Sequence, residues 1–142
     1  LRERGMSEDA LLVERGDWSE PGGQLAMRRL IDSGERFTAL YAGNDSMAIG
    51  AIKAAAEAGL RVPGDVSVLG FDDILQSAHT APPLTTLKVD VNMMAEAACM
   101  LLMHMLDGGS RAGIHAVVPV RLVERESTSP PAGMEFEGGS QR

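Results

Sequence analysis

Short apolar runs alternate along the chain with longer segments in which apolar residues recur every three or four positions. The runs at 10–13, 37–43 and 66–71 are too short for helices and suit buried strands. Amphipathic segments at 19–33 and 46–58 lie between them and predict helices. Strands joined through helices pair in parallel by right-handed crossovers. The pattern therefore predicts an α/β fold, with a parallel sheet and helices on both faces.

Both predicted helices have recognisable ends. Ser19 precedes the first helix and Gly34 follows it, as expected for an N-terminal cap and a C-terminal stop. The second helix begins after Asn44-Asp45 and ends before Gly59. Asp45 adjoins the helical segment, so we expect Asp45 to be the cap, a role worth about 1 kcal/mol. This assignment leaves Asn44 free to face a ligand.

The second half of the chain is less regular. Residues 75–86 lack a clear period and predict an ordered loop, whereas 90–106 predict a methionine-rich helix that is apolar nearly all round. Residues 114–124 suit a strand that Pro119 interrupts, which places this proline at an edge or a bend. The Pro, Gly and Ser-rich segment 129–142 predicts a flexible tail.

Composition narrows the classes of function. The chain has 142 residues, enough for one compact domain. Thirteen Lys and Arg against 20 Asp and Glu give a net charge of -7, with no basic cluster. This segment alone is therefore a poor candidate for binding nucleic acid or an anionic membrane. The single cysteine, Cys99, rules out a disulfide within the chain and is compatible with a reducing cytosol.

Polar side chains follow each of the first three predicted strands at its carboxyl end, the edge where open parallel sheets bind ligands. The pairs are Asp17-Trp18, Asn44-Asp45 and Asp72-Asp73. An indole offers a flat apolar face to a sugar or a base, while amide and carboxylate groups hydrogen-bond hydroxyls. Trp18 could instead be a packing residue, and Asp72-Asp73 a solvated turn or a pair of magnesium ligands.

Residues 37–74, FTALYAGNDSMAIGAIKAAAEAGLRVPGDVSVLGFDDI, closely resemble the C-terminal part of the LacI/GalR family of bacterial transcription regulators. The likeness extends through ERGDWSEPGGQLAMRRLIDSG, PPLTTLKVD and VPVRLVERESTSPP, and so covers nearly all of 9–131. The resemblance implies a type I periplasmic-binding-protein-like core whose two lobes close around an effector. It also implies that Trp18, Asn44 and Asp72 contact that effector.

The same resemblance implies how the chain is divided. Residues 1–89 would be part of the C-terminal lobe, 90–121 a helix and strand of the N-terminal lobe, and 122–128 a strand returning to the C-terminal lobe. We expect an incomplete lobe, with the helix-turn-helix, the hinge and most of the N-terminal lobe outside this chain. The full-length protein would then be a cytoplasmic homodimer that binds operator DNA only through that helix-turn-helix. We expect it to bind no membrane.

Two other classes of protein remain open. A periplasmic-type sugar-binding protein of a transport system has the same fold, but it carries an export signal and no DNA-binding segment. A magnesium-dependent enzyme would use Asp72 and Asp73. The sequence contains no phosphate-binding glycine motif and no assignable nucleophile, so we expect no catalysis, no metal and no cofactor. The expected ligand is a sugar or a nucleoside.

Overall fold

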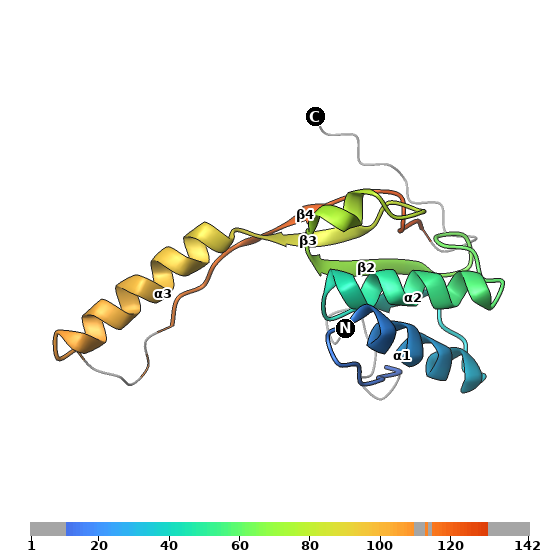
Figure 1. The fold of residues 1–142 in the computed structure, drawn as a ribbon, viewed down its shortest axis with the longest axis horizontal. Helices are drawn as coiled ribbons and strands as arrows, with labels where there is room; N and C mark the ends of the chain where they lie inside the picture. The colour runs from blue at the N-terminus through green and yellow to red at the C-terminus, as the bar shows by residue number, and fades with distance from the viewer. Residues whose placement is uncertain (1–10, 110–112, 114, 131–142) are drawn as a thin grey trace.

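A computed structural model describes residues 11–109, 113 and 115–130 (Figure 1). Helices and strands alternate along the first half of the chain, as the hydrophobic pattern predicts. The elements are α1 (Glu20–Asp32), β1 (Ala39–Tyr41), α2 (Asp45–Glu57), β2 (Ser67–Asp72), the 3-10 helix η3 (Leu75–Ala78), β3 (Thr85–Val89), α3 (Val91–Leu106) and β4 (Val120–Val123). Both amphipathic segments are confirmed as helices, and Ser19 caps α1 as predicted, because its side chain accepts a hydrogen bond from the Gly22 N–H.

The four strands form one sheet in the order β1-β2-β3-β4. The pairs β1-β2 and β2-β3 are parallel, as expected for strands joined through crossovers. The pair β3-β4 is antiparallel, with Lys88 opposite Arg121, because the chain reverses direction between these two strands. The α/β class is confirmed, and β4 adds one antiparallel strand to the predicted parallel sheet, which makes the sheet mixed.

One predicted strand does not form. In the described part of the run at 10–13, Leu11, Leu12 and Val13 adopt no regular structure and are 48%, 41% and 79% exposed. An apolar run becomes a buried strand only where a neighbouring strand satisfies its backbone hydrogen bonds. Within the described residues the sheet ends at β1, so this run has no partner there.

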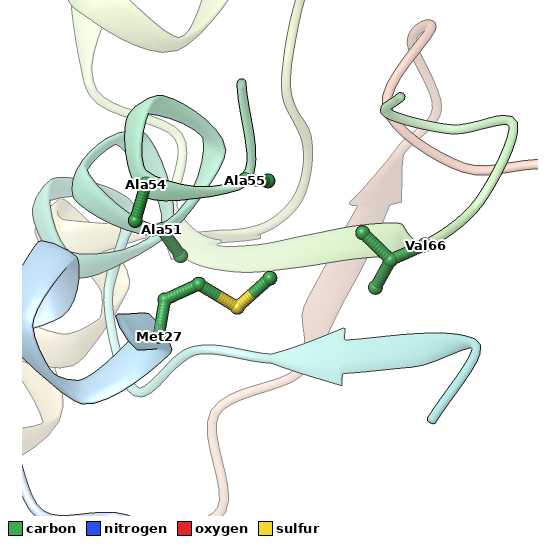
Figure 2. Close-up of a cluster of buried hydrophobic side chains, with 5 residues drawn as sticks. All are labelled: Met27, Ala51, Ala54, Ala55 and Val66. Atoms are coloured by element: carbon green, nitrogen blue, oxygen red, sulfur yellow. The ribbon is translucent and has the colours of Figure 1, made fainter. Parts of the chain in front are cut away.

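The core lies between the two N-terminal helices and the sheet. Met27 of α1 extends toward Val66 beside the alanines of α2, as Figure 2 shows. Close approach of the helices requires glycine, since a Cβ on Gly50 would lie 2.0 Å from the Glu20 carbonyl oxygen and one on Gly23 would lie 2.2 Å from that of Met47. A second buried cluster joins α2 to the sheet and comprises Ala42, Ala48, Ile52, Val68 and Leu84.

Helix α3 extends away from this core, beyond the end of β3 (Figure 1). Asp90 caps it by accepting from the Met93 N–H at 3.0 Å, and none of its residues is buried. In the described part of the chain, no helix combines the length and apolarity that a bilayer-spanning segment needs.

The chain returns to the sheet at β4, which starts after Pro119 and is shorter than predicted, and the segment after β4 stays against the sheet. Ser127 is fully buried where β2 and β3 begin. Its Oγ donates to the Val68 carbonyl oxygen at 2.6 Å and accepts from the Thr85 N–H at 2.8 Å. The backbone of Ser127 also accepts from Val68 at 2.8 Å, so this short segment closes the gap between two strands. Residues 131–142 of the expected tail lie outside the described residues.

Candidate binding site

The candidate site lies at one edge of the sheet. Because β1 and β2 run in parallel, their carboxyl ends lie side by side at this edge. Asn44 comes shortly after the end of β1, and Asp72 is the last residue of β2. Trp18 comes to the same edge from the loop before α1, where its carbonyl oxygen accepts a hydrogen bond from the Asn44 side chain at 2.9 Å. The structure thus joins two of the three residues named from the sequence by a direct bond.

The cap of α2 is Asn44 and not Asp45, which corrects the prediction. Asn44 has the extended backbone of a cap residue, at φ -152° and ψ 172°, and its Oδ1 accepts from the Met47 N–H at 2.8 Å. Asp45 is already the first residue of the helix. From that position its side chain turns inward, away from the free N–H groups of the first turn.

Asp45 is a completely buried carboxylate that joins three segments. Its Oδ2 accepts from the Ile74 N–H at 3.0 Å and the Ser77 hydroxyl at 2.6 Å, and its Oδ1 accepts from the Thr86 hydroxyl at 2.5 Å. The N-terminus of a helix also favours a negative charge. Gly70 provides the space, since a Cβ there would lie 2.2 Å from Asp45 Oδ1. Asp45 therefore anchors the loop after β2 beneath the candidate site.

The sequence analysis missed this anchor, although one signal was available. Thr86 lies beside the buried residues Leu84 and Thr85 and is itself completely buried, and a buried hydroxyl requires a hydrogen-bond partner. In the structure, the side chain that accepts the hydrogen bond from the Thr86 hydroxyl is Asp45.

Trp18 does not fill a gap in the core, because its side chain is 69% exposed. Its backbone is left-handed, with φ +68°, which is uncommon for an aromatic residue. The indole lies against Gly43, where an added Cβ would be 3.0 Å from the ring carbon Cζ3. Asp17 holds the turn, since its Oδ1 accepts from the Ser19 N–H at 3.0 Å and from the Ser19 hydroxyl. The result is an exposed aromatic face on a fixed loop.

Asp72, the last residue of β2, and Asp73, which follows it, have positive φ values of 119° and 59°. Asp72 is exposed, and both residues line an open pocket of about 630 Å³ between the strand ends and the start of α3. Burial raises the pKa of Asp72, and the nearby Asp45 carboxylate adds to the effect. Burial also acts on Asp73, but hydrogen bonds from Arg125 and Lys88 outweigh it and lower the pKa of Asp73. Neither Trp18 nor Asn44 lines this pocket.

The geometry favours ligand binding over metal chemistry. Both Asp73 oxygens already accept from cationic groups, Lys88 Nζ at 2.9 Å and the Arg125 guanidinium. Within the described ranges, no group of three or more His, Cys, Asp or Glu residues is placed to hold a metal ion. What the edge offers is an apolar ring beside an amide, with a carboxylate on the next strand. That combination suits a ligand with both C–H faces and hydroxyl groups.

Comparison with known proteins gives consistent results. A family model described as a periplasmic binding protein-like domain matches residues 1–128. The transcriptional regulator GalR of Escherichia coli (strain K12) is 39% identical over 132 residues, which cover 93% of this chain and 38% of GalR. The chain thus spans about a third of the length of the curated relatives it matches.

Solved structures show the same relationship. A sugar-binding transcriptional regulator of the LacI family from Escherichia coli matches with a TM-score of 0.76 and 37% identity, over 91% of this chain and 46% of that one. The regulator CelR in complex with cellobiose matches with a TM-score of 0.79 and 32% identity, over 89% of this chain and 38% of that one. Identities at this level extend the likeness beyond the fold.

Proposed function

Because the chain belongs to the periplasmic binding protein-like domain family, and within it to the LacI/GalR transcription regulators, we propose that it is the effector-binding part of such a regulator. The full-length protein would act in the cytoplasm as a homodimer, binding operator DNA through a separate helix-turn-helix. Its role would be non-catalytic. The relatives compared above are regulators, which favours this function over that of a transport-system binding protein.

A single observation carries the proposal for the site. Trp18 is held with its ring largely in solvent, on a left-handed backbone, at the sheet edge where ligands bind. Neither core packing nor chain reversal requires a large aromatic side chain at that place. We therefore assign effector contacts to Trp18, Asn44 and Asp72, with the indole covering a C–H face and the polar groups binding hydroxyls.

The division into lobes is part of this proposal. Residues 1–89 would contribute to the C-terminal lobe, 90–121 to the N-terminal lobe, and 122–128 would return to the C-terminal lobe. In support, α3 has no buried residue, whereas Ser127 is fully buried between strands of the main sheet. An effector that binds the closed arrangement of the lobes more tightly shifts the population toward it. The shift in the free energy of operator binding cannot exceed the difference in the free energy of effector binding between the two arrangements.

The ligand class follows from the same groups. We propose a sugar or a nucleoside, because each has a flat C–H surface or ring edged with hydroxyl groups. Two of the compared structures, a sugar-binding regulator and a regulator in complex with cellobiose, favour a sugar over a nucleoside.

The test uses the full-length protein that contains this chain. Isothermal calorimetry with galactose, cellobiose and adenosine is expected to find one ligand that binds, and Trp18→Ala and Asp72→Ala are expected to weaken that binding at least tenfold, a loss of about 1.4 kcal/mol. Asp65→Ala is the control, because Asp65 precedes β2 at the opposite end of the strand and pairs with Arg61. Operator binding without ligand should survive in all three variants. Wild-type affinity in the Trp18 and Asp72 variants would remove these residues from the site.

A further inference from the structure

We propose that Asn44 is the positioning residue for Trp18, holding the indole in place before any effector arrives. This inference rests on the effector site proposed above and adds a positioning role to the contact that is assigned there to Asn44. The sequence suggested that Asn44 would offer a ligand both a donor and an acceptor. In the structure, its oxygen and one of its N–H groups are already in use.

The two partners of Asn44 fix the orientation of its amide. The backbone N–H of Met47 is a donor, so the atom 2.8 Å from it must be the amide oxygen. The carbonyl oxygen of Trp18 is an acceptor, so the atom 2.9 Å from it must be the amide nitrogen. Turning the amide over would set two donors against each other and two acceptors against each other. One side chain thus caps α2 and binds the Trp18 loop at the same time.

Trp18 needs such a contact because little else holds it. Its side chain is 69% exposed, and its φ of +68° is a conformation that non-glycine residues adopt only where the surroundings maintain it. Asp17 and Ser19 stabilise the turn locally. Within the described residues, Asn44 makes the only hydrogen bond to Trp18 from outside that turn. Gly43, next to Asn44, lies under the ring and supplies a surface without a side chain.

Asn44→Asp separates the two roles of this residue. Aspartate and asparagine are equally good N-terminal caps, so the bond to the Met47 N–H persists. The second carboxylate oxygen then faces the Trp18 carbonyl oxygen, an acceptor against an acceptor, and the loop is released. Ser46→Asp is the matched control, because it adds the same charge to the first turn of α2 while Asn44 keeps both hydrogen bonds.

Trp18 is the only tryptophan of the chain, so its fluorescence reports on this loop alone. We expect time-resolved anisotropy of the ligand-free chain to show a larger sub-nanosecond component in Asn44→Asp than in wild type or Ser46→Asp. Thermal midpoints by circular dichroism should be unchanged in all three. In the full-length protein, the ligand found by calorimetry should bind Asn44→Asp about tenfold more weakly, through the lost pre-organisation.

The outcomes distinguish this inference from the proposed function. Unchanged anisotropy in Asn44→Asp overturns the positioning role, whatever the protein binds. A thermal midpoint that falls as far as in Asn44→Ala, which loses the cap as well, shows that the residue acts on the helix and also overturns it. If the wild-type protein binds none of the three ligands, the proposed function fails, while the anisotropy result still decides whether Asn44 positions Trp18.

Discussion

The buried Asp45 anchor makes a quantitative prediction for Thr86→Val. Valine has nearly the shape of threonine but lacks the hydroxyl that donates to Asp45 Oδ1. Thr86 and Asp45 are both completely buried, so water cannot replace the lost donor without rearranging the core. The Ile74 N–H and the Ser77 hydroxyl continue to bind the other carboxylate oxygen. The substitution therefore removes one charge-assisted hydrogen bond and leaves one acceptor without a partner.

The magnitude follows from that single bond. A hydrogen bond to a charged group contributes about 1.5–3 kcal/mol, and the added methyl group changes packing little, so we expect a loss of about 2 kcal/mol. With a denaturant slope of about 2 kcal/mol per molar urea, the unfolding midpoint should fall by about 1 M. This is a large share of the 5–15 kcal/mol that typically stabilises a domain, yet small enough to leave the chain folded.

The assay is urea unfolding of the chain followed by far-ultraviolet circular dichroism. Thr38→Val is the matched control, since Thr38 is exposed and the chemical change is identical. Thr86→Ser keeps the hydroxyl and should recover most of the loss. A double-mutant cycle with Asp45→Asn isolates the contact, because the effect of Thr86→Val should shrink once the charge is gone. A midpoint for Thr86→Val equal to that of Thr38→Val would refute the anchor.

Three further predictions concern the same edge of the sheet. Gly70→Ala should lower the free energy of unfolding by about 2 kcal/mol in the same urea assay, because the new Cβ meets the Asp45 carboxylate and Leu84. Gly64→Ala is the control and should not lower it, because a Cβ at Gly64 would lie at ordinary contact distances of 3.4 Å or more from Arg61. Asp72→Asn should raise the thermal midpoint at pH 7: the folded-state pKa of Asp72 is raised, so its ionised form opposes folding, and the gain should vanish as the pH falls below 3.8. A thermal midpoint that does not rise would show that the ionised carboxylate of Asp72 does not oppose folding. Asp73→Asn should lower the thermal midpoint at pH 7, because the pKa of Asp73 is lowered in the folded state and its ionised form stabilises the fold above pH 3.8. That contribution disappears as the pH falls through the folded-state pKa. Curves of thermal midpoint against pH that run parallel for the variant and wild type would contradict this prediction.

Local signals in the sequence were sufficient for the helices but not for every strand. Helices α1 and α2 were predicted because periodicity, a polar residue before the first turn and a glycine after the last are all encoded within each segment. The run at 11–13 carries an equally clear apolar signal, yet whether it forms a strand depends on a partner elsewhere in the chain. The antiparallel pairing of β4 is also a non-local feature, since the residues of β4 alone do not determine whether it runs parallel or antiparallel to β3.

The candidate site was predictable to the same extent. Parallel topology indicated that Asn44 and Asp72 would lie at the same edge of the sheet, as the pairing of β1 and β2 places them. Trp18 contacts Asn44 although the described part of the run before it forms no strand, so topology does not account for its position. The sequence could not decide which of Asn44 and Asp45 caps the helix, because both residue types are good caps. The decision comes from Ser77 and Thr86, which lie 32 and 41 residues away from Asp45 and require a buried acceptor. Tertiary contacts, and not local preference, therefore decide that Asn44 caps the helix and that Asp45 is buried.

The division between these two neighbours explains how this edge of the sheet is both stable and open. Asn44, with an extended backbone, directs its amide outward to the Trp18 loop, whereas Asp45, in the first helical turn, directs its carboxylate inward to the loop after β2. Substitutions on the inner side should therefore change the free energy of unfolding, and those on the outer side should change ligand affinity. Asp72 lies between the two: its side chain reaches solvent, but the part of its surface that the protein covers and the Asp45 charge raise its pKa. The raised pKa means that the ionised carboxylate of Asp72 opposes folding, which is compatible with the binding role proposed for it above.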